Sequence, residues 1–180
     1  TVANTSGTCG LSIVSATNGD GNLYYADGTS GDATYRGFIR YNHTLDQFRI
    51  GVAGAEKLRI DSSGRLLINK TTNRNKYFNG TYTGKLQVEG TDDSTRLTQF
   101  IHNSGNASQP ILILGKSRGG VGDYTVVQDD DFLGTISFQG ADGDEMVDAA
   151  RIEVQVNGTP GNDNMPCLLY TSDAADDGIR

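Results

Sequence analysis

Short apolar runs alternate with polar turns along most of this chain, which predicts many short β-strands. In residues 58–61, Leu58 and Ile60 alternate with Arg59 and Asp61, so one face of a strand is expected to be buried and the other solvated. The links between runs are two to five residues long and polar or glycine-containing, which suits hairpins. Residues 35–69 are therefore predicted to form a β-meander, with strands at 38–42, 47–52, 57–61 and 65–69.

Further strands are expected on both sides of this meander. They lie at 11–15, 22–27, 85–89, 96–103, 111–116, 125–127, 134–139 and 150–156. Ile111–Leu114 is continuously apolar, which predicts a strand that is covered on both faces. Asp144–Ala150 is the single helix candidate and is too short to matter. The pattern therefore predicts an all-β fold of meander and hairpin modules.

The predicted strands fall into two modules. The first spans 1–72, a junction rich in Asn, Gly, Thr and Tyr spans 73–84, and a second β-rich module spans 85–166. Sheets of short strands expose many edges, and exposed edges invite pairing. Association of copies is therefore expected, with closed cyclic symmetry as the default.

Composition supports an ordered chain and excludes some partners. Gly is 24 of 180 residues and hydrophobic residues are 36%, values that many turns and short strands explain better than disorder does. The net charge of −7 and the pI near 4.7 argue against nucleic acid or an anionic membrane as the main partner. No apolar run approaches the roughly 20 residues of a membrane span, so no membrane insertion is expected.

Several motifs of the first module together resemble a module of bacteriophage tail fibres. They are Tyr24–Gly31, Tyr35–Gly37, Tyr41–His43, Phe48–Gly51 and Leu58–Arg65. A second set resembles the module that often follows in the same fibres: Leu114–Arg118, Thr125–Gln128, Leu133–Phe138 and Val156–Gly161. The resemblance covers about residues 10–72 and 85–166. It points to an architecture and not to a chemistry.

The resemblance implies an elongated homotrimeric fibre shaft that supports host-receptor attachment. It implies a virion protein that is made in the bacterial cytoplasm and contacts other tail fibre or baseplate proteins. A host surface glycan or protein would be bound through other parts of the fibre. No enzymatic activity and no cofactor are expected.

The last residues resemble the translation of a common sequencing adapter. Cys167–Asp176 matches that translation codon by codon, whereas the fibre module is expected to continue with Gly, Arg and another strand after Pro166. Residues 167–180 are therefore interpreted as a non-native tail. The chain does not begin with Met and is interpreted as a fragment of a longer protein. Cys9 then has no disulfide partner.

Each candidate for chemistry has a structural explanation that we favour. Oxygen ligands for a metal ion are offered by Asp129–Asp131 and by the group Asp142, Asp144 and Glu145, but neither stretch fits the twelve-residue calcium loop. Paired carboxylates could also catalyse glycoside hydrolysis, but the distance between them cannot be read from the sequence. Asn18–Asn22 resembles a single calcium β-roll repeat, and a hairpin turn is favoured. No catalytic, cofactor or metal residue is therefore assigned.

The remaining motifs are treated in the same way. His43, beside Asp46, and His102 lack an evident nucleophile, and the Gly-Lys-Ser of 115–117 lacks the first glycine of a phosphate loop. The meander arginines are expected to form a charged outer sheet face: Arg36, Arg40, Arg49, Arg59 and Arg65. Glycosylation-type sequons begin at Asn4, Asn42, Asn69, Asn79, Asn106 and Asn157, which the composition explains.

An alternative function is a carbohydrate-binding β-sandwich module of a bacterial surface adhesin. Its sugar site would be lined by Tyr24, Tyr25, Tyr35, Tyr41, Tyr77, Phe78 and Tyr82. A spike depolymerase is a third hypothesis, which activity on host polysaccharide would distinguish.

Overall fold

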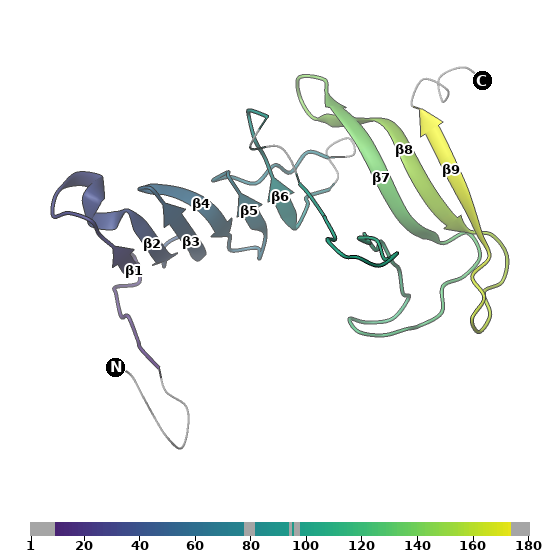
Figure 1. Ribbon diagram of the computed structural model, residues 1–180, viewed down its shortest axis with the longest axis horizontal. Helices are drawn as coiled ribbons and strands as arrows, with labels where there is room; N and C mark the ends of the chain where they lie inside the picture. Colours follow the sequence, from purple (N-terminus) through teal and green to yellow (C-terminus); the bar gives the residue numbers. More distant parts are fainter. Residues whose placement is uncertain (1–9, 78–81, 94, 96–97, 174–180) are drawn as a thin grey trace. The chain divides into compact units, whose positions relative to one another are not determined.

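The computed structural model describes residues 10–77, 82–93, 95 and 98–173. These residues form nine β-strands in two sheets and a single helix, η1 (Gly31–Tyr35), which is a 3-10 helix (Figure 1). The predicted all-β class is therefore confirmed. The chain divides into two compact units, one of residues 1–75 and 83–98 and the other of residues 76–82 and 99–180.

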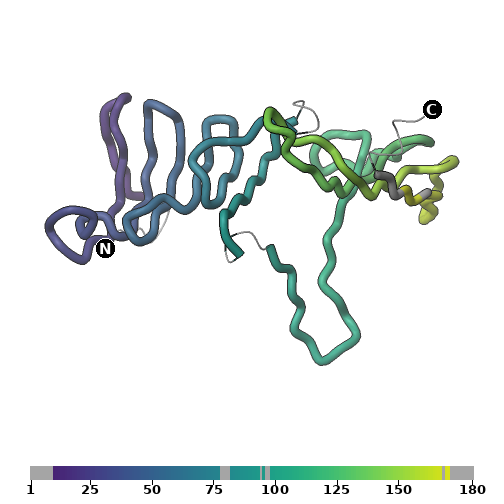
Figure 2. The backbone as a smooth tube through the Cα atoms, turned by 90° about the horizontal axis from the view of Figure 1, so that it is seen from above, coloured from purple at the N-terminus to yellow at the C-terminus, as the bar shows by residue number. Residues whose placement is uncertain are grey.

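The first unit contains a six-stranded sheet in the order β1-β2-β3-β4-β5-β6. Its strands are β1 (Asp20–Tyr25), β2 (Gly37–Asn42), β3 (Gln47–Val52), β4 (Ala55–Ile60), β5 (Leu66–Ile68) and β6 (Leu86–Val88). The first five strands are antiparallel neighbours in chain order, which confirms the predicted meander, and Figure 2 shows their hairpins side by side. β6 returns to pair with β5 in parallel.

Local turn chemistry explains where these hairpins reverse. Ala53 and Gly54 connect β3 to β4, and both have positive φ angles, of 54° and 77°. Two such residues give the type I′ geometry that matches the twist of paired strands. Between β2 and β3, the Asn42 carboxamide accepts the Leu45 N–H at 2.8 Å, and Asp46 has a φ of 47°. Asn and Asp favour such turns because their side chains bond to nearby backbone.

The second unit contains a three-stranded antiparallel sheet in the order β7-β8-β9. Its strands are β7 (Phe132–Ala141), β8 (Met146–Val156) and β9 (Cys167–Asp173). Asp144–Ala150, the helix candidate judged too short to matter, is not a helix, and most of this stretch is the start of β8. β9 comes from the proposed non-native tail and occupies the place where the fibre module is expected to have a strand.

Several predicted strands do not form. No strand pairing is found at residues 11–15, 98–103, 111–116 or 125–127. Residues 96–97 of the predicted strand 96–103 lie outside the described part of the chain. Ile111–Leu114 was expected to be covered on both faces, and that prediction is also wrong, because its side chains are 49–81% exposed. Apolar β-prone residues form a strand only where a partner supplies the other half of the ladder.

Candidate functional site: an exposed apolar sheet face

The six-stranded sheet has one face made almost entirely of apolar side chains, which we call the apolar face. Alternation along each strand and the pairing register place the same kind of residue at matched positions. One row across the sheet is Leu23, Ile39, Ile50, Leu58, Ile68 and Val88. A second row is Tyr41, Phe48, Ile60, Leu66 and Leu86, and Tyr25 and Val52 extend the face.

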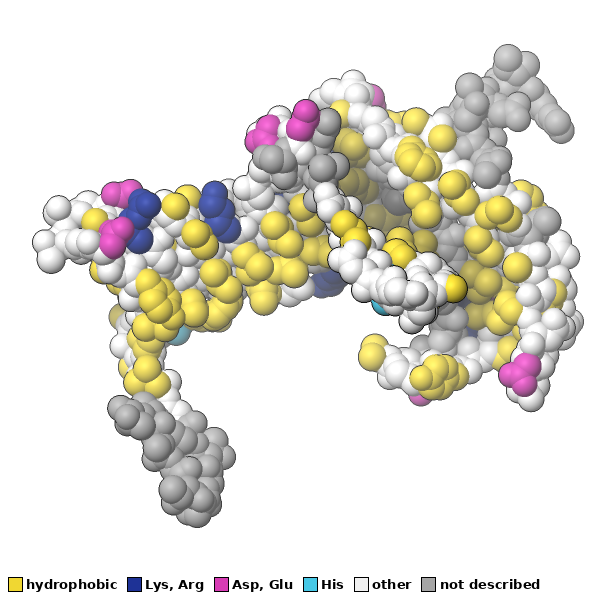
Figure 3. All heavy atoms as spheres, viewed as in Figure 1, with side chains coloured by type: hydrophobic (Ala, Val, Ile, Leu, Met, Phe, Trp, Pro, Cys, Tyr) yellow, Lys and Arg dark blue, Asp and Glu magenta, His cyan; other side chains and the backbone are white. Residues whose placement is uncertain are grey.

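No side chain of the apolar face is buried in the single chain. Eight of its large side chains are 37–62% exposed: Leu23, Tyr25, Tyr41, Phe48, Val52, Ile60, Leu86 and Val88. Figure 3 shows hydrophobic side chains gathered over the strands of this sheet. Contiguous exposed apolar surface of this kind marks an interaction site on a soluble protein.

The opposite face carries three arginines in register, which we call the arginine row. Arg40 lies opposite Arg49, and Arg49 lies opposite Arg59. Like charges in adjacent strands repel, so this row needs acceptors close by. Glu56 accepts from Arg59 at 2.6 and 2.8 Å, and Asn22 accepts from Arg40 Nε at 2.7 Å.

The arginine row is the better buried face, which corrects the sequence-based expectation of a charged outer face. Arg59 is 7% exposed, and burial, followed by repulsion from Arg59, lowers the pKa of Arg49. The expectation that Arg59 and Asp61 are solvated and Ile60 is buried is wrong, because Asp61 is buried and Ile60 is 43% exposed. Arginine stems lie along the sheet and cover their own face.

The other two meander arginines pair with nearby carboxylates. Arg65 Nε lies 2.7 Å from an Asp61 oxygen, and Arg36 contacts Asp32 at 3.3 Å. Burial raises the pKa of Asp61, but hydrogen bonds from Arg65 and Ser63 outweigh it and lower that pKa below its usual value. These charges are engaged within the chain and do not form a free basic stripe of the kind that binds nucleic acid.

The described residues bury very little hydrophobic surface for a chain of this length. Their buried hydrophobic residues are Phe38, Leu67, Val127 and Val156. A domain of about 150 residues normally buries close to 70% of the surface of its unfolded chain. The described part of the single chain therefore has a small core, and the apolar face is a surface that association can bury.

In the second unit, Asp131 forms the most densely bonded charge cluster around a single residue. Its carboxylate accepts from Lys116 Nζ at 2.7 Å, from Arg118 at 2.7 and 2.9 Å and from the Gln128 N–H at 2.9 Å. The hydrogen bonds from Arg118, then Lys116, hold the pKa of this carboxyl far below its usual range. This cluster, which we call the Asp131 clamp, ties the 116–118 segment to the start of β7.

The other acidic candidates act as turn caps. Asp129 accepts the Gly158 N–H at 2.6 Å, and Asp142 accepts the Asp144 and Glu145 N–H groups at 2.9 Å each. Hydrogen bonds from the Glu145 and Asp144 N–H groups lower the pKa of Asp142. Within the described ranges, no group of three or more His, Cys, Asp or Glu side chains is arranged to hold a metal ion.

The remaining candidates are also engaged in local structure. The His43 ring lies edge-on against Tyr41 at 5.0 Å between ring centroids, and the His43 backbone N–H donates to Gly19 O in the turn before β1. In the Gly-Lys-Ser stretch, Lys116 belongs to the Asp131 clamp and Ser117 donates to Thr125 O. His102 lies in an exposed segment without strand pairing.

The tyrosines of the alternative sugar site do not form one platform. Tyr24 lies 6.2 Å from Tyr35 between ring centroids, on the same face as the arginine row, whereas Tyr25 belongs to the apolar face. Tyr77 and Tyr82 form an isolated bridge that belongs to the other unit. Some sequence-based candidates lie outside the described residues: Asn4, Cys9, Phe78 and Asn79.

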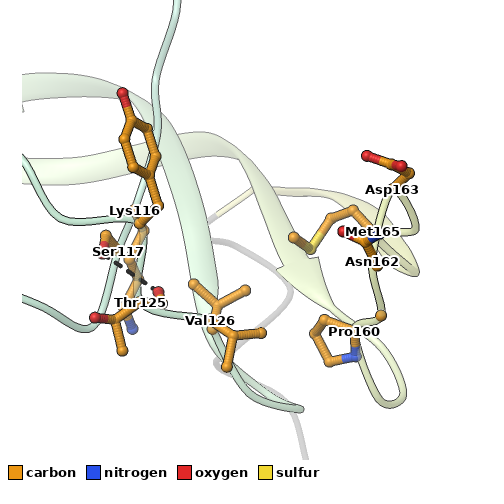
Figure 4. Close-up of a pocket in the computed structure, with 11 residues that line it drawn as sticks. Lys116, Ser117, Thr125, Val126, Pro160, Asn162, Asp163 and Met165 are labelled. Carbon is orange, nitrogen blue, oxygen red and sulfur yellow. Dashed lines mark hydrogen bonds between the residues drawn. The ribbon is translucent and has the colours of Figure 1, made fainter.

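A groove of about 500 Å³ lies between the 116–127 segment and the 160–165 turn. Figure 4 shows Val126 and Pro160 facing one another across it, with Met165 beside them. The dashed line marks the bond from Ser117 to Thr125 O. The lining is mainly apolar and contains no His, Cys or paired carboxylates, so it has no nucleophile–base arrangement.

Among the described residues, no helix is long and apolar enough to cross a membrane. No protein-family model matches the chain, and no curated protein sequence matches it. Its function is therefore inferred from the chemistry of its own residues, and the apolar face is the feature with the clearest functional meaning.

Proposed function

We propose that this chain is a structural segment of a bacteriophage tail fibre, which assembles as a homotrimer into a shaft that supports host-receptor attachment. The single observation that carries the proposal is the exposed apolar face of the six-stranded sheet. The resemblance of residues 10–72 and 85–166 to fibre modules supplies the biological context. The protein would be made in the bacterial cytoplasm and would act in the phage tail, beside other fibre or baseplate proteins.

The distribution of polar contacts supports copies of the same chain as the covering partner. The arginine row finds most of its acceptors within its own unit, although Arg49 Nε, which is buried and lies 3.7 Å from a Glu56 oxygen, makes no hydrogen bond. The apolar face has no such compensation. Three copies that turn their apolar faces toward a common axis would bury these rows together, and cyclic symmetry presents the same patch from each copy.

The proposed role is mechanical, and the engagement of the described charged groups in local structure is consistent with it. The titratable groups with shifted pKa values, such as Asp61, Asp131 and Asp142, are hydrogen-bonded in turns and ion pairs. Shifted groups in structural ion pairs do not by themselves mark an active site. Several fibres per particle would then give attachment strength through avidity, even where each contact is weak.

The deciding experiment is the solution mass of the 180-residue chain, measured by light scattering on a sizing column with sedimentation velocity in parallel. We expect three chain masses of 19.2 kDa each and a frictional ratio above that of a compact sphere. The mass should hold over a range of protein concentrations. A well-folded single chain by circular dichroism, with a mass of 19.2 kDa, would contradict the proposal.

A further inference from the structure

A second apolar feature lies in the segment Ile111–Leu114. Its four side chains are 68, 64, 81 and 49% exposed. Within residues 98–117 no backbone–backbone hydrogen bond is formed, and the N–H groups of Asn106 and Ser108 donate to the nearby side chains of Ser104 and Asn106. Figure 2 shows the backbone before residue 117 as an open excursion without paired strands. Such a run has the composition of a β-strand, but it has no partner strand to accept and donate its backbone hydrogen bonds.

The second sheet offers a matching edge. β7 is ten residues long and pairs with β8 alone among the described residues. Its outer N–H and C=O groups therefore form a free row, which is a template for an added strand. Phe132–Ala141 contains neither proline nor lysine, and its register with β8 shifts between Phe132 and Gly134 and between Phe138 and Gln139, which leaves Gly134–Phe138 as its regular stretch.

The face beside this edge is apolar and incompletely covered. Ile136 and Phe138 of β7 are 44% and 55% exposed, and Ile136 pairs with Ile152 of β8. A groove of about 190 Å³ lies on this face, lined by Leu114, Leu133, Gly134, Ile136, Ile152 and Val154. The other face of the two strands is polar, with Thr135 opposite Glu153 and Ser137 opposite Arg151.

The segment and the edge meet at one point within the chain. A Cβ placed on Gly134 would lie 2.8 Å from Leu114 Cβ, so the downstream end of the segment touches the start of β7. The Asp131 clamp holds the following residues, Lys116 and Arg118. Upstream of Leu114, Ile111–Ile113 has no strand partner among the described residues of its own unit.

We propose that Ile111–Ile113 of one copy, upstream of the Leu114 contact with its own Gly134, adds as a strand to the free edge of β7 in a neighbouring copy. This inference rests on the proposed homotrimer and names one of its contacts. All three residues are apolar, so either strand register places at least one of them on the apolar side of the β7–β8 sheet. This strand addition would give the segment a hydrogen-bonded partner strand and would cover the free edge of β7.

The test is photocrosslinking between two tagged copies of the full chain. One copy carries p-benzoylphenylalanine in place of Ile113 and a histidine tag, and the co-expressed second copy carries a Strep tag and no photoreactive residue. Irradiation should give a product that contains both tags, and peptide mapping should place the new bond in residues 132–141 of the Strep-tagged chain. Leu112 is labelled in a second variant, so that the result does not depend on one side chain.

The matched control carries the photoreactive residue in place of Ile101, which is 70% exposed in the same unpaired stretch. We expect at least a several-fold lower yield of the two-tag product that maps to 132–141 from this control. An assembled protein whose crosslinks stay within one chain, or map elsewhere, overturns the strand addition and leaves the proposed function intact. A chain that stays monomeric by light scattering overturns both.

Discussion

At the scale of single residues, Gly51 shows how a missing side chain makes room for the core. The Phe38 ring lies over Gly51, and an added Cβ would stand 2.0 Å from Phe38 Cε1. Phe38 is 6% exposed and also lies under the Arg40 guanidinium, 4.9 Å from the ring centroid. Strand propensity alone would favour a β-branched residue at this position, so the glycine reflects packing and not backbone preference.

Gly51→Ala is therefore expected to destabilise the first unit by about 1–3 kcal/mol, because the new methyl group must displace a buried ring. Chemical denaturation at fixed protein concentration measures the change in free energy of unfolding. Gly140→Ala is the matched control, since nothing lies within 4 Å of a Cβ at this β7 glycine. Equal stability of Gly51→Ala and Gly140→Ala would refute the packing argument.

The Asp131 clamp predicts a pH dependence of stability. Its folded-state pKa lies below the unfolded value of about 3.9, so the clamp stabilises the fold fully above that value and is lost as the pH falls toward the folded pKa. Asp131→Asn should lower the melting temperature at pH 7, and the gap to the wild type should narrow below about pH 4. Asp163→Asn, at an exposed turn position, serves as the control. A gap that stays constant from pH 7 to pH 3 would show that the carboxylate charge does not act through the clamp.

At the scale of elements, the sequence predicts those strands whose partners follow within a few residues. The meander of β2 to β5 forms as expected because each strand pairs with its neighbour across a short turn. Residues 111–116 and 125–127 have similar apolar character and form no strand. The pattern of a strand is local, whereas its partner lies elsewhere in the chain or in another copy, and no local signal reveals it.

The sequence also predicts only part of the candidate surface. Alternation in residues 58–61 correctly separates the two faces of β4, but it does not say which face the chain covers. Apolar residues were expected inside, whereas Arg59 is buried and Ile60 is exposed. The acceptors of the arginine row come from three strands, so only the folded register reveals which groups this face supplies to its own arginines.

At the scale of the whole molecule, the described residues of each unit form one sheet with a polar side and an apolar side that is only partly covered. A β-sheet needs a second layer over its apolar face to be stable in water. The described residues place no such layer on the apolar face of the first unit, where eight large side chains stay exposed. Assembly then supplies the layer that one chain lacks, so folding and association should be coupled.

This coupling can be tested by one charge on the apolar face. Phe48 is 37% exposed and lies between Tyr41 and Ile60 in its row, and Phe48→Lys should dissociate the assembly because three lysines would meet across the axis. Loss of each buried large apolar side chain costs about 1.5–3 kcal/mol, which corresponds to a roughly ten- to hundredfold weaker association per contact.

Thr44→Lys adds the same charge in the exposed turn before β3 and should leave the assembled mass unchanged. Light scattering over a dilution series compares the two variants, with circular dichroism as a check on folding. An assembled mass for Phe48→Lys equal to that of Thr44→Lys at every concentration would mean that the apolar face is covered by something other than a second copy of this chain.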